Sequence, residues 1–370
     1  MAELILDLDR NRSTPVYKQI EDQLREKILR GELPAGSCLP NGQQLSKSFG
    51  VAYRTVLRSL NRLKKQGLLR GVPSLGTFVQ AVPSRKVQNI AITFDRSYQH
   101  AIARDVERFQ RGIMAACGDH FHLQLFPLHN GTIFSEDEPT LLARMIEDWH
   151  IHGVITYSAA PPEDIDRLMQ FRIPTVTSRD IYPGTDVPWV MEDVEDGAKK
   201  LVHFLVAGLG HRRISLVMGP RPRQHSRVLR PSGMLAEALV RELSLQRIVC
   251  PDKWILYSDF RWESVAKPFH QMLAAPDRPT AIIFADDSMA MEGLKSLNLL
   301  NLSVPRDISV ASYGDFLSPD TILTAIHLPM EEVARRAVSY LEELTQGRQP
   351  TIEMLPVELM IRQTCGSAPR

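Results

Sequence analysis

A run of cationic side chains in the first quarter of the chain is the part of the sequence with the clearest chemistry. Residues 54–70 contain no Asp or Glu and six basic residues, namely Arg54, Arg58, Arg62, Lys64, Lys65 and Arg70. Several of them recur at intervals of three or four residues, so a helix would carry them on one face. Such a face binds a polyanion when its cations neutralise phosphates, although many charged helix faces meet only water.

The distribution of charge along the chain favours the polyanion. Residues 1–86 hold 15 Lys or Arg and 7 Asp or Glu, whereas the remaining 284 residues hold 29 and 36. The net charge of +1 conceals this contrast. A basic N-terminal part attached to a mildly acidic remainder indicates that only the N-terminal part meets a polyanion.

Three short helices and a hairpin are the elements that must hold the basic run. Thr14-Pro15 is typical of a helix start, and Gly31 ends the helix that follows. Asn41 and Gln44 have the spacing of a capping box, which predicts a short second helix. The basic run then falls on a third helix.

That third helix is predicted over residues 52–66. Val56 and Leu60 share its apolar face, and the basic side chains lie around the opposite one. Residues 68–72 and 77–80 predict two short strands joined by a turn. Residues 1–80, called the head below, are thus predicted to form an α+β winged helix-turn-helix, whose third helix enters the major groove of DNA.

The head resembles the GntR family of bacterial repressors over nearly 70 residues. The matching residues keep the family order and spacing: Pro15-Val16-Tyr17-Lys18-Gln19-Ile20, Ile28…Gly31-Glu32-Leu33, Pro34-Ala35-Gly36…Leu39-Pro40, Gly50-Val51…Thr55-Val56…Leu60, Gly67-Leu68-Leu69 and Gly76-Thr77-Phe78-Val79. The resemblance implies binding to double-stranded operator DNA. The residues predicted to touch DNA are Gln43, Tyr53, Arg54, Thr55, Arg58, Arg62, Lys65 and Gly76.

The family pattern is broken at several positions that usually contact DNA. The family usually has Ser-Glu where this chain has Asn41-Gly42, and an Arg where it has Gln43. Ala52-Tyr53 stands in place of Ser-Arg, Leu57 in place of a second Arg, and Ser74 in place of a Gly in the wing. We expect Arg54, Thr55 and Arg58 to replace the lost contacts in a shifted register. The operator of a relative is therefore no guide to the operator of this chain.

Strands and helices alternate after a polar linker at residues 81–87. The predicted strands are 89–94, 122–126, 153–157, 175–177, 213–218, 280–284 and 308–312, with amphipathic helices between them. This alternation predicts parallel α/β sheets flanked by helices. Residues 88–365, called the body below, are too long for one doubly wound sheet, so we expect two lobes with a ligand at the carboxyl ends of their strands.

The body resembles the LacI/GalR effector domain, a relative of periplasmic sugar-binding proteins. Seven motifs stand in family order: Asp193…Gly197, Gly210-His211-Arg212-Arg213-Ile214, Arg230-Pro231-Ser232-Gly233-Met234, Arg278-Pro279-Thr280-Ala281-Ile282, Asp286-Asp287-Ser288-Met289-Ala290, Val304-Pro305-Arg306-Asp307-Ile308-Ser309-Val310 and Glu358-Leu359…Arg362. With the GntR-type head, the chain resembles the arabinose repressor subgroup. The resemblance implies a homodimeric repressor controlled by a small-molecule effector, a sugar or sugar acid, in the cleft between the lobes.

Seven residues are candidates for contact with this effector: Tyr98, Arg179, Asp193, Arg230, Phe260, Asp286 and Asp315. Arginine and carboxylate groups bind sugar hydroxyls through paired hydrogen bonds, and an aromatic ring packs on the apolar face of a sugar. Structural roles are the alternatives: a surface ion pair for Arg230, an electrostatic effect at a helix N-terminus for Asp193, helix capping for Asp286, packing for Phe260 and Trp262, and a loop tether for His211.

Two departures from the family pattern concern the effector. Gly314 stands where the family has an Asp that often contacts the ligand, and Asp315 remains. The usual Asp-Arg after an earlier strand is reversed to Arg179-Asp180. Arg179 and Arg230 together favour an acidic or phosphorylated ligand. The same departures leave a second interpretation open, in which the body binds no ligand and serves dimerisation or partner docking.

The sequence carries no recognisable catalytic motif. It has no phosphate-binding loop, no Gly-x-Ser-x-Gly, no His-Glu-x-x-His and no dinucleotide-binding glycine pattern, so we expect no enzyme, cofactor or metal. The four cysteines lie far apart, which predicts free and mostly buried thiols. The chain lacks a signal-peptide pattern and a long apolar run, and we expect it in the cytoplasm with no membrane partner.

Overall fold

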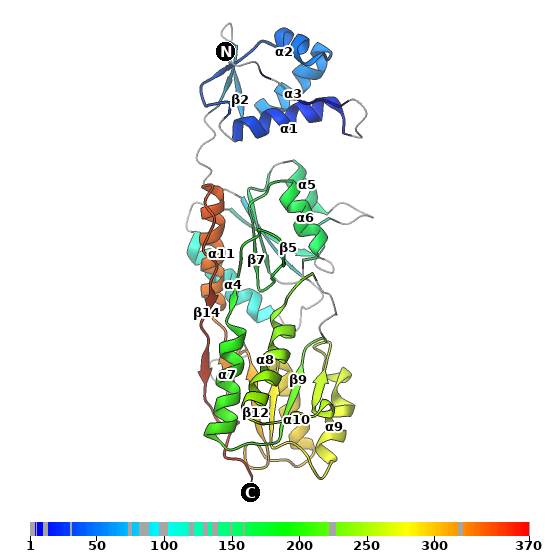
Figure 1. The fold of residues 1–370 in the computed structure, drawn as a ribbon, viewed down its shortest axis with the longest axis vertical. Helices are drawn as coiled ribbons and strands as arrows, with labels where there is room; N and C mark the ends of the chain where they lie inside the picture. The colour runs from blue at the N-terminus through cyan, green and yellow to red at the C-terminus, as the bar shows by residue number, and fades with distance from the viewer. Residues whose placement is uncertain are drawn as a thin grey trace. The chain divides into compact units, whose positions relative to one another are not determined.

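The computed structural model of the chain divides into two compact units, Met1–Lys86 and Val87–Arg370 (Figure 1). The residues it describes are 4, 6–9, 14–29, 32–72, 76–80, 89–95, 103–117, 122–128, 132–134, 140–148, 150–157, 160–221, 227–316 and 321–369. The predicted linker at residues 81–87 lies outside them. Among the described residues, no helix is both long enough and apolar enough to cross a membrane.

The first unit is a winged helix, as the sequence predicts. Its helices are α1 (Val16–Leu29), α2 (Gly42–Phe49) and α3 (Tyr53–Lys65), and its strands are β1 (Cys38–Leu39), β2 (Leu69–Val72) and β3 (Gly76–Val79). The strands form an antiparallel sheet in the order β1-β3-β2. The predicted capping box is confirmed: the Asn41 side chain accepts from the backbone N–H of Gln44, whose side chain accepts from the Asn41 N–H.

Apolar residues from all three helices and the sheet form the core of the first unit. Ile20 and Leu24 of α1 pack with Val56, Leu60 and Leu63 of α3, and all five are buried. Burying each of these side chains contributes about 1.5–3 kcal/mol. The apolar face of α3 therefore faces this core, and the helix holds its remaining residues on a fixed scaffold.

The second unit contains two α/β lobes. The N-lobe has a sheet in the order β14-β8-β7-β6-β4-β5 and the C-lobe a sheet in the order β10-β9-β11-β12-β13-β15. The N-lobe elements are β4 (Asn89–Asp95), α4 (Ala103–Cys117), β5 (His122–Leu128), α5 (Leu141–Glu147), β6 (Gly153–Tyr157), α6 (Pro162–Gln170), β7 (Thr175–Ser178), β8 (Trp189–Glu192), α11 (Met330–Thr345) and β14 (Met354–Leu355). The C-lobe elements are α7 (Val194–His203), β9 (Ile214–Met218), α8 (Pro231–Leu245), β10 (Ile255–Tyr257), α9 (Ala266–Ala274), β11 (Ala281–Phe284), α10 (Asp287–Leu299), β12 (Ser309–Tyr313), β13 (Thr324–His327) and β15 (Glu358–Met360).

Each sheet is covered by helices on both faces. Consecutive strand residues point to opposite sides, so neighbours in one strand pack against different helices. In the N-lobe, Ile92 faces α4 and α11 whereas Ala91 faces α5 and α6. In the C-lobe, Ile283 faces α7 and α8 whereas Ile282 faces α9 and α10. The strands are buried on both sides, as in other parallel sheets.

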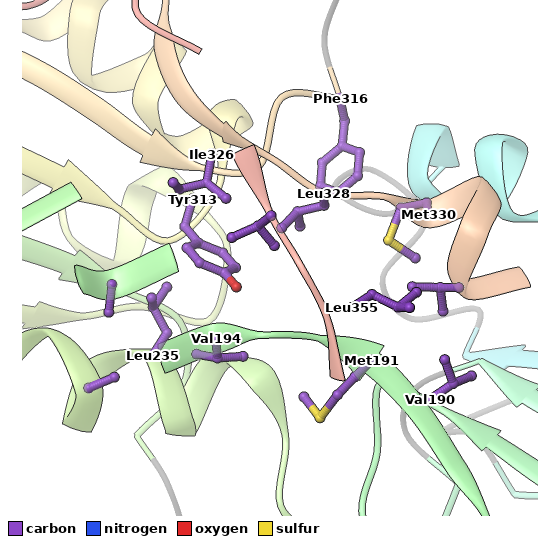
Figure 2. Close-up of a cluster of buried hydrophobic side chains, with 14 of the residues drawn as sticks. Val190, Met191, Val194, Leu235, Tyr313, Phe316, Ile326, Leu328, Met330 and Leu355 are labelled. Atoms are coloured by element: carbon purple, nitrogen blue, oxygen red, sulfur yellow. The ribbon is translucent and has the colours of Figure 1, made fainter. Parts of the chain in front are cut away.

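The chain crosses between the lobes three times, and these crossings orient the two sheets. β8 leads from the N-lobe into α7, β13 leads back into α11, and β14 leads again to β15. Apart from the antiparallel β15, neighbouring strands in each sheet are parallel. The carboxyl ends of the two sheets therefore face each other, and a buried apolar cluster continues across the crossings (Figure 2).

The structure adds several short elements that the sequence analysis did not predict. These are helix α6 and the strands β1, β8, β10, β13, β14 and β15. The strands among them are two to four residues long. The cysteine prediction holds in part: all four thiols are free, Cys117 is buried, Cys250 and Cys365 are partly buried, and Cys38 is exposed.

Candidate functional site

The basic run lies on α3, where its members have different surroundings. Arg54 and Lys65 are exposed, and neither forms an ion pair with a described residue. Arg58 is exposed too, and its guanidinium lies 3.8 Å from the centre of the Tyr17 ring on α1. These cations lie opposite the buried face of the helix, where phosphates can reach them.

Arg62 belongs to a buried polar cluster between α1 and α3. Its Nε donates to Glu21 at 2.7 Å, and Glu21 is fully buried. Glu21 also accepts from the Arg25 guanidinium at 2.6 Å and from the Gln66 amide at 2.8 Å. A buried carboxylate requires such partners. The charge of Arg62 is thus paired with a carboxylate of the head itself. This pair could not be predicted from the sequence pattern, because Glu21 lies 41 residues away.

Gly42, Tyr53 and Leu57 meet where the first turns of α2 and α3 come together. A Cβ atom on Gly42 would lie 2.8 Å from Tyr53 Cε2 and 3.7 Å from Leu57 Cδ2. Tyr53 remains 45% exposed and Leu57 partly exposed. These are three of the positions at which the sequence departs from the GntR pattern, so the departures form one contact.

The other predicted DNA contacts lie on α2, α3 and β3. Gln43 is exposed on the first turn of α2, and Thr55 is partly exposed on α3. Gly76 is exposed at the start of β3 with φ of 123°, in the left-handed region that favours glycine. Residues 73–75, which join the two strands of the wing and include Ser74, lie outside the described residues.

In the second unit, several buried polar atoms lie at or near the carboxyl ends of strands in both sheets. Four of them have no hydrogen-bond partner among the described residues: Thr156 Oγ1, Ser178 Oγ, Asp286 Oδ2 and Tyr313 Oη. Thr156 and Ser178 stand at the ends of N-lobe strands, and Tyr313 and Asp286 at or just after the ends of C-lobe strands. Buried polar groups are normally hydrogen-bonded, so each of these atoms is suited to a contact with a polar ligand or water.

Asp286 has the helix-capping role that the sequence offers as an alternative to effector contact, and one of its carboxylate oxygens has no described donor. Its Oδ1 accepts from the backbone N–H of Met289 at 2.8 Å, so the residue caps α10. Its Oδ2 is buried and points to no described donor. Burial raises the pKa of this carboxyl from 3.8 to about 6.

Arg179 forms an ion pair at the first crossing between the lobes. Its guanidinium binds both oxygens of the fully buried Glu192, at 3.2 and 2.9 Å, and lies 3.5 Å from the Tyr157 hydroxyl. Its backbone φ of 64° is in the left-handed region, which is uncommon for arginine and frequent at functional sites. Burial and the Glu192 carboxylate both raise the pKa of Tyr313, which places that hydroxyl in the same electrostatic environment.

Arg230 stands at the start of α8, where it also meets a buried carboxylate. Its Nε lies 3.5 Å from Asp180 Oδ1, and Asp180 is fully buried. The Tyr182 hydroxyl donates to the other oxygen of Asp180 at 3.3 Å. The Arg230 side chain is exposed, so it can keep its ion pair with Asp180 and also contact a ligand.

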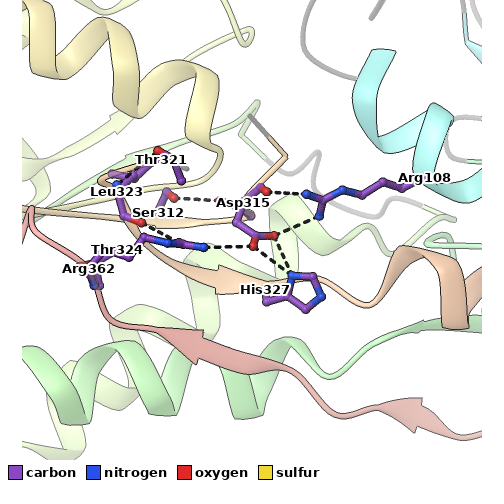
Figure 3. Close-up of polar contacts among 9 residues, drawn as sticks. Arg108, Ser312, Asp315, Thr321, Leu323, Thr324, His327 and Arg362 are labelled. Atoms are coloured by element: carbon purple, nitrogen blue, oxygen red, sulfur yellow. Dashed lines mark hydrogen bonds and ion pairs between the residues drawn. The ribbon is translucent and has the colours of Figure 1, made fainter. Parts of the chain in front are cut away.

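Asp315 lies in an ion cluster that joins the lobes (Figure 3). Its carboxylate is 3.3 Å from Arg108 of α4 in the N-lobe, 3.0 Å from His327 and 3.7 Å from Arg362. The Arg108 guanidinium also donates to the Asp315 carbonyl at 3.0 Å. Asp315 is buried, so the structure gives this predicted ligand contact three cationic partners within the protein itself.

Two family models match the chain. The model described as bacterial regulatory proteins, gntR family, matches residues 16–79, and the model described as a periplasmic binding protein-like domain matches residues 203–365. Three curated relatives match nearly end to end. The repressor PurR of Photorhabdus laumondii is 34% identical over an alignment 345 positions long, which covers 85% of this chain and 94% of that protein.

The other two relatives are more distant. The arabinose metabolism transcriptional repressor of Geobacillus stearothermophilus is 25% identical over 92% of this chain and 93% of its own length. The regulator AglR of Rhizobium meliloti is 26% identical over 89% and 95%. The chain belongs to this family of bacterial transcription repressors. It is a DNA-binding regulator and not an enzyme, with a GntR-type head on a LacI-type body.

Solved structures show the fold of the repressor's body. A LacI-family regulatory protein from Chloroflexus aggregans superposes with a TM-score of 0.65 at 19% identity, over 75% of this chain and 98% of the other. The lac repressor dimer, solved with operator and an anti-inducer, superposes with a TM-score of 0.59 at 22% identity, over 75% and 94%. These likenesses confirm the two-lobed architecture.

Asp193, Phe260 and Trp262 of the repressor cap a helix or pack against neighbouring residues. Asp193 caps α7 through the backbone N–H of Asp196, at 3.0 Å. Phe260, with φ of 63°, fills the space over Gly219, where a Cβ would lie 2.4 Å from the ring. Trp262 packs edge-on against Phe269. Tyr98 lies outside the described residues.

His211 confirms its predicted role as a tether in the repressor. Its ring nitrogens lie 3.0 Å from Thr280 Oγ1 and Ser309 Oγ, and Nε2 also lies 3.0 Å from the Gly366 carbonyl. The sequence analysis missed Glu192 and Tyr313, which complete the polar group at the crossings. Glu192 directly precedes the predicted Asp193, and that adjacency is the only sequence signal that could have found it.

Proposed function

We propose that the repressor responds to a small, uncharged polyhydroxy ligand, such as a neutral sugar, bound between the lobes of its body. The observation that carries this proposal is the set of buried polar atoms without described partners at the facing ends of both sheets. Hydroxyl groups both donate and accept hydrogen bonds, so a polyhydroxy ligand suits a mixture of hydroxyl and carboxylate oxygens. The proposed contacts are Tyr98, Arg179, Asp193, Arg230, Phe260, Asp286 and Asp315.

Charge balance favours a neutral ligand over an acidic or phosphorylated one. Arg179 is paired with Glu192, and Arg230 lies against Asp180, so each cation already has a buried counter-charge. An anionic ligand would have to compete with these carboxylates, and it would also meet Asp286. Transfer of an unpaired charge into a buried site is costly.

The head is proposed to bind operator DNA through α2, α3 and the wing, in a homodimer. The proposed contacts are Gln43, Tyr53, Arg54, Thr55, Arg58, Arg62, Lys65 and Gly76, of which Arg62 is also held by Glu21. Two heads of a symmetric dimer fit a two-fold operator. A ligand that prefers one arrangement of the lobes changes DNA affinity by its difference in affinity for the two arrangements. Since its target is chromosomal DNA, we place the protein in the cytoplasm.

Isothermal titration calorimetry with the full chain tests the ligand proposal. The panel contains neutral sugars, sugar acids and sugar phosphates, and we expect heat from a neutral sugar. Asp286→Ala should remove that heat, whereas Asp277→Asn should retain it, because Asp277 precedes the amino end of β11, away from the facing carboxyl ends. Binding by a sugar phosphate alone would contradict the neutral class. No heat from any compound would favour a body that serves only dimerisation or partner docking.

A further inference from the structure

We infer that Gly42, Tyr53 and Leu57 form a methyl-reading patch that recognises a thymine in the operator. The inference rests on the proposed docking of α3 and adds the base that its first turn reads. The patch is uncharged and lies where the first turns of α2 and α3 meet, and its sequence neighbours Gln43 and Arg54 are exposed. N-terminal residues of a recognition helix are the ones that contact base edges.

The two side chains of the patch are apolar without belonging to the core. Buried Val56, Leu60 and Leu63 face the hydrophobic cluster of the head, and neither Tyr53 nor Leu57 is a member of that cluster as the described residues form it. Tyr53 and Leu57 are four residues apart and so adjacent on the helix surface. Tyr53 is exposed and Leu57 is partly exposed, so both can contact an apolar feature of a partner.

Gly42 fixes where the Tyr53 ring lies. A Cβ at position 42 would be only 2.8 Å from Tyr53 Cε2, so the ring occupies space that any other residue would fill. The Asn41 capping box fixes the first turn of α2, so the backbone of Gly42 that the ring packs against has a defined position. The ring is thereby held in place before DNA arrives, which lowers the entropy cost of using it in recognition.

The chemistry of the major groove identifies the base. Guanine, cytosine and adenine present only hydrogen-bonding groups there, whereas thymine also presents its C5-methyl group. A tyrosine ring edge and a leucine side chain offer carbon surface to that methyl. The neighbouring Arg54 and Gln43 are exposed and free to bind phosphates or other base edges. We therefore assign the patch to a thymine rather than to a guanine.

Replacing thymine by uracil tests the assignment, because it removes the methyl group alone. The full chain first selects a fragment from genomic DNA, and each thymine of the bound half-site is then replaced in turn. We expect one replacement per half-site to weaken binding about fourfold, which corresponds to the ~0.8 kcal/mol of one buried methyl-sized group. Tyr53→Ala and Leu57→Ala should bind thymine and uracil versions equally.

Three further variants separate the possible causes. Tyr53→Phe should keep the thymine preference, because the ring and not the hydroxyl makes the contact. Gly42→Ala should reduce it by displacing the ring. Lys65→Ala should weaken both versions alike and leave their ratio unchanged. Circular dichroism checks that each variant is folded.

The inference is overturned if no uracil replacement weakens binding, if Tyr53→Ala retains the preference, or if Tyr53→Phe loses it. Failure of the full chain to bind any genomic fragment would overturn the docking of α3 itself.

Discussion

One carboxylate oxygen of Asp286 is buried and has no described donor. Ionisation of this carboxyl therefore lowers the folding stability, to an extent that depends on pH. The pKa is raised to about 6, so between about pH 4 and 6 the folded protein binds more protons at this residue than the unfolded chain does. Stability therefore falls as pH rises through this window and stays lower above it. The difference from the ordinary value of 3.8 corresponds to about 3 kcal/mol at neutral pH.

Asp286→Asn should raise the melting temperature of the body above pH 6 and leave it nearly unchanged at pH 4. Asparagine cannot ionise and caps a helix as well as aspartate does, so only the buried charge is lost. Calorimetric melts at pH 4, 5, 6 and 7.5 measure this. A lower melting temperature at pH 7.5 would show that the charge has a stabilising partner.

Arg62 and Lys65 are neighbours on one basic helix but differ in what they contact. Arg62→Ala should destabilise the head by about 1.5–3 kcal/mol, because the buried Glu21 loses one charge-assisted hydrogen bond while those from Arg25 and Gln66 remain. Lys65→Ala should leave stability within about 0.5 kcal/mol and reduce the salt dependence of DNA binding by about one counterion. Urea unfolding and binding at several salt concentrations distinguish the two. Equal stability of both variants would contradict the role given to Arg62.

At the scale of elements, the crossings between the lobes are held by the Asp315 cluster. Hydrogen bonding to Asp315 raises the pKa of His327, so the charged imidazole is favoured in the folded state. Its contribution is fully present below the unfolded pKa of about 6.5 and is lost as pH rises through the higher folded value. Arg108 ties this cluster to the N-lobe.

Asp315→Asn should therefore destabilise the body by about 3–5 kcal/mol, since three cationic side chains lose their shared carboxylate. It should also abolish the part of the pH dependence of stability that belongs to His327. Urea unfolding at pH 6 and pH 8, with the His327 titration followed by NMR, provides the measurement. An unchanged His327 pKa in the variant would contradict the assignment.

The sequence was sufficient for the long elements and insufficient for the pairings between them. Helices such as α3 and α11 have clear periodicity, and a strand such as β6 is a short run buried at every position, so both kinds of element could be predicted. Strands β8 and β13 are four residues long and carry no alternating pattern. They become strands through pairing, β8 with β7 and β14, and β13 with β12 and β15. The Arg179–Glu192 pair depends on that register, which explains why the sequence suggested a free arginine and an acidic ligand.

In the proposed function, a small molecule bound by the body controls the DNA-binding head. The two are compact units, so control requires the body to have two arrangements that differ in affinity for the ligand. Coupling energies between such sites are typically about 1–3 kcal/mol, which is about 5- to 150-fold in affinity. Thermodynamic linkage makes the effect reciprocal.

The most direct test is the affinity of the full chain for its own operator fragment, measured by fluorescence anisotropy at fixed salt with and without the neutral sugar found by calorimetry. We predict that saturating sugar changes the operator Kd by at least about fivefold. Operator DNA should change the sugar Kd by the same factor, and Asp286→Ala should abolish both changes. An operator Kd that is the same with and without bound sugar would contradict the account.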